Sequence, residues 1–249
     1  MYLRKSFLTF TRNYNVLCLN LIQQNLYSYH VNKNYVPLQF LINTLQYSNN
    51  SPSKCWNCNF VYKSDLFCSK CKVLQEPPEN LTYFDIIGIS RSYDVKITEI
   101  QKKYKELQKL LHPDKYSTKS EKEKQLSENL SSLVNKAYTT LIHPLKRGLY
   151  MLKLNGITIS EETDSLNAEF LMKIMEKNEE IEEATNNVEK IKKLVQDNEI
   201  ILNNLAKKIA DAFRQEDIEK AKSFLVQMKY YDSINNRLKK LKHDLGIIE

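Results

Sequence analysis

The sequence predicts an all-α protein from its periodic segments, and two further observations limit its chemistry and its number of domains. Periodic segments rich in leucine, lysine and glutamate dominate the second half of the 249 residues, and these residue types favour helices. Only four glycines occur and they are scattered, so neither a glycine-rich phosphate loop nor a dinucleotide-binding fingerprint can be written. A hydrophobic content of 42% with 27% charged residues is ordinary for a chain of one or two domains.

The net charge of +7 is unevenly distributed along the chain. Residues 1–54 hold five of the 37 Lys and Arg residues and none of the 30 Asp and Glu residues. The rest of the chain therefore has 32 basic and 30 acidic residues, a net charge of only +2. Because nucleic-acid binding depends on clustered positive charge, this balance argues against a nucleic-acid partner.

Residues 1–54 have the composition of a mitochondrial transit peptide and leader. They contain no acid, many Asn, Tyr, Leu and Ser residues, and a few dispersed basic ones, as import sequences do. An Asn-rich tail without a targeting role is the alternative. The stretch Val16 to Leu26 has too many Asn and Gln residues for a membrane span of about 20 apolar residues. We expect the mitochondrial matrix, with a cytosolic pool left open, and no membrane partner.

Two Cys-x-x-Cys pairs follow the leader, in the segment 55–76. Each pair can coordinate a metal ion from a tight turn. The residues between the pairs have room for a short strand at 60–62. Four thiolates in this arrangement suit tetrahedral zinc. The ligands are Cys55, Cys58, Cys68 and Cys71.

Other assignments for these four cysteines fit less well. Two disulfides are disfavoured in a reducing compartment, and a redox pair of the thioredoxin type needs a βαβ context that is missing. Iron in the same cage is the main rival to zinc. A knuckle of this size has almost no core, so the metal must hold it folded. We expect structural zinc, with the role of the knuckle open between a cap, a dimer contact and a partner-docking knob.

Beyond the stiff linker Glu76–Glu79, two amphipathic segments flank the tripeptide His112-Pro113-Asp114. Apolar residues from Ile97 to Leu111 recur every three or four positions, and the leucines from Leu126 to Leu141 repeat this spacing. We expect an antiparallel helical hairpin with the tripeptide in its exposed connection. A basic strip shares the outer face of the first helix: Lys102, Lys105 and Lys109.

Short signals set the expected ends of these helices. Tyr83 to Ile87 forms a short apolar helix that Gly88 ends as a C-cap. The next helix can begin at Thr98, with a capping box, or a turn earlier with Asp94 as its N-cap. The third helix is expected from about residue 119 to residue 141.

The ordered combination of these motifs over residues 80–155 resembles a J-domain. The resemblance rests on residues 83–88, Tyr104, the tripeptide, and residues 135–138 with Leu141, Pro144 and Arg147. It implies that His112, Pro113 and Asp114 dock on a DnaK-type chaperone and stimulate its ATPase, with Lys102, Lys105 and Lys109 as electrostatic contacts. A basic strip beside a rigid loop agrees with such steering. His112 has no nucleophile or metal-ligand residue beside it in the sequence, so we expect it to have no acid–base role. The protein is therefore not expected to be an enzyme.

Residues 164–249 are expected to form a C-terminal three-helix bundle. Long periodic segments at 187–213 and 217–245 join a third from Leu166 to about Ala184. The expected stripe of the second helix comprises Val188, Ile191, Leu194 or Val195, Ile201 or Leu202, Leu205 and Ile209. That of the third comprises Phe224, Met228, Tyr231, Ile234, Leu238, Leu241 and Leu245.

The first bundle helix has more apolar surface than one core face requires. Leu166, Phe170, Ile174 and Ile181 share one sector, whereas Leu171, Met172 and Met175 lie on the other side. Nine acidic and two basic residues between positions 161 and 183 surround this second patch. Either the J-domain covers it, or it is a protein-docking face with adaptable methionines. Tyr230 falls off the core stripe of its helix and can join the same face.

The order of knuckle, J-domain and bundle resembles the eukaryotic mitochondrial HscB-type co-chaperones of iron-sulfur cluster biogenesis. In that family the bundle binds the cluster scaffold protein, which implies scaffold contacts at Leu171, Met172, Met175, Glu176, Glu179 and Tyr230. Leu110-Leu111 departs from the basic-aromatic pair of general J-domains, and nine residues between the cysteine pairs is a short gap.

The resemblance predicts a non-enzymatic co-chaperone that holds the scaffold and stimulates a mitochondrial DnaK-type ATPase to promote cluster transfer. Cluster-recipient proteins are further candidate partners, and a homodimer is left open. One alternative is a J-domain adaptor for other clients, and another is a zinc-ribbon nucleic-acid-binding protein.

Overall fold

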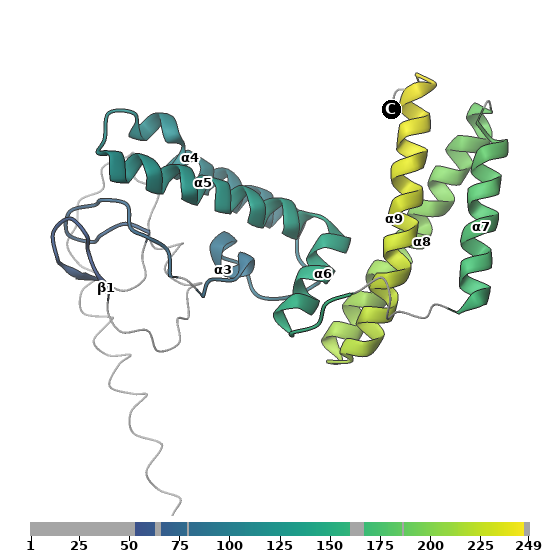
Figure 1. Ribbon diagram of the computed structural model, residues 1–249, viewed down its shortest axis with the longest axis horizontal. Helices are drawn as coiled ribbons and strands as arrows, with labels where there is room; N and C mark the ends of the chain where they lie inside the picture. The colour runs from purple at the N-terminus through teal and green to yellow at the C-terminus, as the bar shows by residue number, and fades with distance from the viewer. Residues whose placement is uncertain (1–52, 63–65, 79, 160–166, 186, 247–249) are drawn as a thin grey trace, which may run out of the picture. The chain divides into compact units, whose positions relative to one another are not determined.

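The computed structural model describes residues 53–62, 66–78, 80–159, 167–185 and 187–246. Residues 1–52 of the predicted transit peptide and leader, Cys18 among them, and Leu166 lie outside these residues. Within them the chain forms seven α-helices, one 3₁₀ turn and one two-stranded sheet, which confirms the all-α prediction (Figure 1). No helix in this part of the chain is long and apolar enough to cross a membrane.

The predicted J-domain consists of α3 (Tyr83–Ile87), α4 (Ile97–Leu111), η2 (Pro113–Tyr116), α5 (Glu121–Ile142) and α6 (Pro144–Leu154). Thr82 and Asp85 form a capping box at the start of α3, and Gly88 ends it with a left-handed φ of 78°, as expected for a C-cap glycine. The predicted bounds of α3 are therefore confirmed.

The helices α4 and α5 lie alongside each other as the predicted hairpin (Figure 1). Tyr104 stacks on Tyr138 with ring centroids 4.0 Å apart. Tyr104 Oη and Gln108 Nε2 both donate to Asn135 Oδ1, at 2.9 and 2.7 Å. Apolar side chains of α3, α4 and α5 fill one core: Phe84, Ile87, Ile100, Leu107, Leu111, Leu126, Leu130, Val134, Ala137 and Leu141.

Both predicted N-caps of α4 are wrong. The helix begins behind Lys96, whose side chain makes no capping hydrogen bond. Asp94 is engaged elsewhere: its backbone N–H donates to Ser92 Oγ at 3.1 Å, and its carboxylate lies 3.9 Å from the Arg214 guanidinium. Asp94 lies two residues before the N-cap Lys96 and does not cap α4.

The helix α6 is not predicted by the sequence pattern, although two of its residues, Pro144 and Arg147, belong to the J-domain resemblance. Pro144 stands at its first position and His143 precedes it, a place where a missing backbone donor costs nothing. Arg147 is buried on α6 and donates to the Leu141 carbonyl at 2.5 Å. This bond ties α6 back to the end of α5.

The C-terminal bundle consists of α7 (Ala168–Glu183), α8 (Val188–Arg214) and α9 (Ile218–Asp244). Side-chain N-caps start all three helices: Asn167, Asn187 and Asp217 accept from backbone N–H groups. The three predicted helices are confirmed to within two residues at each end that the structure describes (Figure 1).

Most of the predicted bundle stripes are buried, but their ends are not. Val188 and Leu245 are exposed because each lies at a helix end. The predicted stripe of α9 omits Ala221, Leu225 and Val226, which are all buried. The predicted stripe fails there because this end of α9 packs against α6. Gly148 of α6 lies so close to Leu225 that a Cβ at position 148 would clash with the Leu225 side chain. Asn198 of α8 is a polar residue that is buried in the bundle, and its Nδ2 donates to the Tyr231 carbonyl at 3.2 Å.

Aromatic and charged side chains join the J-domain to the bundle. Tyr93 stacks on Phe213 of α8 with centroids 5.7 Å apart, and the Arg147 guanidinium lies 4.8 Å from the Tyr93 ring centre. Burial raises the pKa of Tyr93 to about 12, although the positive charge of Arg147 acts to lower it. Burial also lowers the pKa of Arg147. Tyr93 therefore keeps its ordinary neutral form at physiological pH.

Candidate functional site

The tripeptide His112-Pro113-Asp114 forms the predicted tip between α4 and α5. His112 ends α4, and Pro113 stands at the first position of η2. His112 Nδ1 accepts from the Asp114 backbone N–H at 3.3 Å, and both side chains are exposed. The end of α4, the turn η2 and the ring of Pro113 therefore fix the backbone of the loop. Its polar side chains face solvent.

Tyr116 anchors this tip from beneath. Its side chain is buried in the J-domain core, and its hydroxyl donates to the Leu110 carbonyl at 3.2 Å. Burial, with the nearby Glu123 carboxylate adding to it, raises the pKa of Tyr116. Ser127 Oγ donates to the Leu111 carbonyl at 2.8 Å and is fully buried. The last carbonyls of α4 are thus satisfied by side chains, which fixes where the exposed loop begins.

The basic strip of α4 is exposed as predicted. Lys102, Lys105 and Lys109 all face solvent, and Leu110 is exposed beside them. Lys103 differs, because its ammonium donates to the Gly88 carbonyl and lies 3.9 Å from Glu99. Positive charge therefore follows one outer face of α4 up to the tripeptide, where it can attract an acidic partner.

The four predicted metal ligands lie in one cluster. β1 (Ser53–Lys54) pairs antiparallel with β2 (Val61–Tyr62), which confirms the expected short strand and begins two residues inside the predicted leader. The two cysteine turns are alike: Asn59 N donates to the Cys55 carbonyl and Lys72 N to the Cys68 carbonyl, both at 2.9 Å. The four sulfur atoms all lie within 4.8 Å of one another. The residues that could hold a metal ion here are Cys55, Cys58, Cys68 and Cys71.

The sulfur spacing fits a tetrahedral metal ion. Cys55 Sγ lies 3.6 Å from Cys71 Sγ, and Cys58 Sγ lies 3.7 Å from Cys68 Sγ. Metal–sulfur bonds of about 2.3 Å in a tetrahedron would separate sulfurs by about 3.8 Å. The four cysteines are free thiols and not disulfides, so the cage can hold a metal ion.

The thiols also perturb one another. Burial raises the pKa of Cys55, but hydrogen bonds from the Cys58 and Asn57 backbones outweigh it and lower the pKa to about 6. A backbone hydrogen bond from Phe60 lowers the pKa of Cys58, but burial and the neighbouring thiols raise it to about 12. Backbone hydrogen bonds, first from Cys71, lower the pKa of Cys68. A bound cation would stabilise the thiolate form of the four cysteines.

The surplus apolar patch of α7 is exposed. Leu171, Met172 and Met175 are 39%, 62% and 63% exposed, so the J-domain does not cover them. Glu176 and Glu179 are exposed on the same helix. Ile174 and Ile181 fill the bundle core from the opposite face, as the helical spacing predicts.

Tyr230 joins the patch through Phe170. The two rings meet edge to face with centroids 5.8 Å apart, and Tyr230 is 36% exposed. Phe170 also packs edge to face on Tyr231, at 6.0 Å. We name the exposed residues that α7 and α9 contribute here the bundle face: Leu171, Met172, Met175, Glu176, Glu179 and Tyr230.

Comparisons with known proteins agree with both halves of the chain. A DnaJ domain model matches residues 82–150, and an HSCB C-terminal oligomerisation domain model matches residues 166–239. The mouse iron-sulfur cluster co-chaperone protein HscB is 41% identical over 193 residues, which cover 75% of this chain and 81% of the mouse protein. The human protein of the same name is 39% identical over the same shares. The chain belongs to the HscB family of iron-sulfur cluster co-chaperones.

Solved structures extend the match to the fold. The crystal structure of human HscB superposes with a TM-score of 0.71 at 38% identity, covering 76% of this chain and 98% of the human one. HscB from Vibrio cholerae superposes with a TM-score of 0.60 at 23% identity, which concerns the fold alone. Membership of this co-chaperone family confirms the predicted J-domain and C-terminal helical domain and the expectation that the protein is not an enzyme.

Sequence reasoning missed the polar residues that hold these sites in place. Gln75 touches the cysteine cage and Trp56 touches the J-domain, whereas Arg237 ties α7 to α9. Trp56 carried a usable signal, because it is the single tryptophan and lies inside the first cysteine pair. Gln75 and Arg237 carried none, since a single polar side chain adds nothing to a helical or strand period.

Proposed function

We propose that this HscB family member binds the iron-sulfur cluster scaffold protein on the bundle face and brings it to a DnaK-type chaperone. The loop His112-Pro113-Asp114 stimulates the ATPase of that chaperone and so promotes cluster transfer. The observation that carries the proposal is the exposed, acid-ringed apolar patch of α7 in a chain that also exposes this loop. One chain thus offers a cargo surface and a chaperone trigger.

The chaperone half of the proposal rests on the tip of the hairpin. The exposed His112 and Asp114 side chains stand on a backbone fixed by Pro113 and buried Tyr116. Lys102, Lys105 and Lys109 supply the long-range attraction for an acidic chaperone surface, since like-signed charges on one face steer association. No group in the loop takes part in hydrolysis, because the active site belongs to the chaperone.

The scaffold half rests on the chemistry of the bundle face. Leu171, Met172 and Met175 are apolar anchors that gain most when a partner removes them from water. Methionines adapt to an irregular partner surface. Glu176 and Glu179 at the rim fit a partner with basic residues around an apolar centre, because rim charges set orientation and specificity.

The cysteine cage is proposed to hold structural zinc. Four thiolates with tetrahedral spacing leave no open coordination position for substrate. The cage would therefore stabilise the knuckle and not carry the transferred cluster. Iron in the same cage is the rival, and it would give the purified protein a visible iron–thiolate spectrum.

The matrix of the mitochondrion is the proposed location. The support is the composition of residues 1–54, which contain five basic residues and no acidic one. This compartment would bring the protein together with a mitochondrial DnaK-type chaperone. Cluster-recipient proteins are then further candidates for contact.

Titration with purified scaffold protein tests the proposed cargo surface. We expect the triple variant Leu171→Ala, Met172→Ala, Met175→Ala to bind at least about tenfold more weakly, a loss of about 1.4 kcal/mol. Val188→Ala with Ile200→Ala is the matched control, because it removes exposed apolar surface from α8 instead. Equal scaffold affinity of the triple variant and the wild type would contradict the proposal and favour a J-domain adaptor for other clients.

A further inference from the structure

The cysteine knuckle packs against the J-domain. Leu74, just after the second cysteine pair, is fully buried in the same hydrophobic cluster as the J-domain helices. Trp56, Leu66 and Phe67 are partly buried against this cluster, and Phe67 pairs with Leu74 through an antiparallel bridge. The knuckle therefore shares a core with the domain that carries the chaperone-docking loop.

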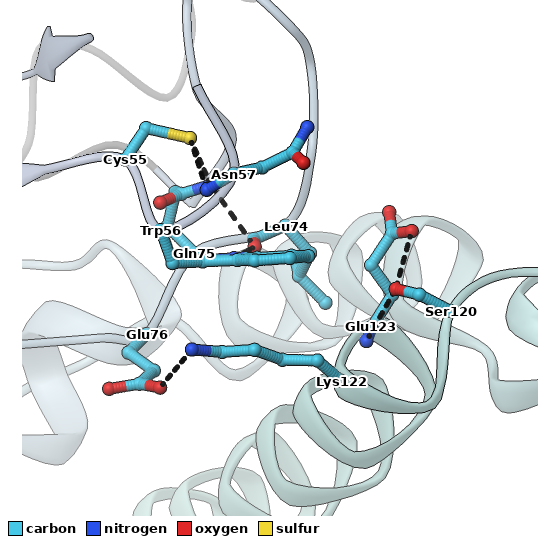
Figure 2. A network of polar contacts seen from close by, with 9 residues as sticks. All are labelled: Cys55, Trp56, Asn57, Leu74, Gln75, Glu76, Ser120, Lys122 and Glu123. Carbon is cyan, nitrogen blue, oxygen red and sulfur yellow. Dashed lines mark hydrogen bonds and ion pairs between the residues drawn. The ribbon is translucent and has the colours of Figure 1, made fainter. Parts of the chain in front are cut away.

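Trp56 and Glu76 of the knuckle segment both contact Lys122 of α5. Trp56 Nε1 donates to the Leu74 carbonyl at 2.7 Å. The Lys122 ammonium lies 4.9 Å from the Trp56 ring centre, a distance at which cation–π attraction acts. The same ammonium lies 3.6 Å from Glu76. Figure 2 shows the Lys122 side chain running along the Trp56 side chain toward Glu76.

Gln75 connects the same segment to the metal cage. Its side chain is 1% exposed, and its Nε2 lies 3.4 Å from Cys55 Sγ, 2.9 Å from the Val73 carbonyl and 3.2 Å from the Leu74 carbonyl. All three neighbours are acceptors, so the amide must present its nitrogen here. A buried donor aimed at a thiolate stabilises its negative charge and orients it, as outer-shell partners of metal ligands do.

The surface that Trp56 contacts is the first turn of α5. Lys122 is the second residue of this helix, which starts seven residues after Asp114. Ser120 Oγ accepts from Glu123 N at 3.3 Å and caps the same turn. The turn η2, which holds the buried loop anchor Tyr116, packs against α5, and Tyr116 shares a hydrophobic core with Leu126 of this helix. A continuous set of contacts thus runs from Cys55 to the base of the loop.

We propose that the metal-loaded knuckle braces the chaperone-docking end of the J-domain, with Gln75 and Trp56 as the positioning residues. Gln75 couples the Cys55 ligand to the Leu74 backbone, and Trp56 couples Leu74 to Lys122 of α5. Because the knuckle has almost no core of its own, loss of the metal frees both cysteine turns. Trp56 and Leu74 then lose their support, and the start of α5 loosens. The effect on the chaperone rests on the proposed function of the loop.

Trp56 itself reports on the first step. It is the single tryptophan of the chain, so fluorescence of the full-length protein, excited at the long-wavelength edge where the tyrosines do not absorb, observes only this contact. Removing the metal with a chelator under reducing conditions should shift the emission to longer wavelength, and adding zinc should restore it. Amide hydrogen exchange should rise in residues 113–126 on metal removal, while exchange in α8 and α9 stays unchanged.

Variants separate the links of the brace. Gln75→Met keeps the side-chain volume but removes the donor, and we expect at least about tenfold weaker zinc retention in chelator competition. Lys122→Met should increase exchange in residues 113–126, and Lys122→Arg should restore protection because it keeps the cation on the ring. Lys124→Met is the control, since Lys124 pairs with Glu121 on its own helix.

The chaperone assay gives a readout beyond stability. Metal removal should raise the concentration of protein needed for half-maximal ATPase stimulation and leave the maximal stimulated rate unchanged. Unchanged exchange in residues 113–126 after the Trp56 emission has shifted would overturn the brace, because the knuckle would then fold without reference to α5. A zinc-loaded protein that never stimulates the chaperone would contradict the proposed function instead, while the exchange result would still decide the brace.

Discussion

At the scale of residues, buried polar side chains set where the exposed sites begin. The Leu111 carbonyl is the last of α4 and would be an unpaired acceptor in the core without Ser127. Tyr116 does the same for the Leu110 carbonyl. The docking loop is therefore held at its base by side chains of α5 and η2, because a buried acceptor without a donor is costly.

Ser127→Ala should lower the free energy of unfolding by about 1 to 2 kcal/mol, because the Leu111 carbonyl loses its buried donor. Urea unfolding followed by circular dichroism measures the change, with the slope of the transition unaltered. Ser132→Ala is the matched control, since Ser132 lies on the same helix and is exposed. A variant at position 127 as stable as this control would show that the hydrogen bond contributes nothing.

At the scale of elements, α7 is held to the bundle by few contacts. Ile174 and Ile181 fill the core, and Arg237 of α9 donates to Asn178 Oδ1 at 3.1 Å and to Glu182 Oε1 at 3.0 Å. Both acceptors lie on α7, the helix that carries most of the bundle face. Arg237 thus fixes the angle at which Leu171, Met172 and Met175 are presented.

Arg237→Met should increase amide hydrogen exchange in α7 while α8 and α9 remain protected. The loss of global stability should be about 1 kcal/mol or less, because the ion pair with Glu182 is largely exposed. Lys240→Met removes the same charge from an exposed position of α9 and serves as the control. Exchange in α7 that rises equally in both variants would point to net charge and not to the Arg237 contacts.

The elements also show what periodicity can and cannot predict. Long helices such as α8 and α9 were predicted closely, because an apolar stripe repeated over seven turns is a strong signal. The cap of α4 was mistaken, because an apolar stripe does not fix the first residue of a helix, and α4 begins behind Lys96 without a side-chain cap. The α9 stripe missed Leu225 because its neighbour Gly148 is 77 positions away and no local pattern contains it.

At the scale of the whole molecule, one chain combines a metal knuckle, a J-domain and a helical bundle. The knuckle shares a core with the J-domain through Leu74, and the J-domain joins the bundle through Tyr93, Arg147 and Phe213. The clustering of the four cysteines and the exposure of the bundle face were predictable from spacing and from the resemblance to HscB-type co-chaperones. The joints between the parts were not, because each depends on a few side chains brought together by the fold.

The central claim is that the chaperone trigger and the cargo surface are separate sites that act together. The most direct test measures ATP hydrolysis by the DnaK-type chaperone with the protein alone and with the scaffold added. We expect wild-type protein to stimulate hydrolysis and the scaffold to increase this stimulation further. His112→Gln should abolish both effects, whereas the triple alanine variant of the bundle face should keep the first and lose the second. Full stimulation by His112→Gln, or an undiminished scaffold effect with the triple variant, would contradict the claim.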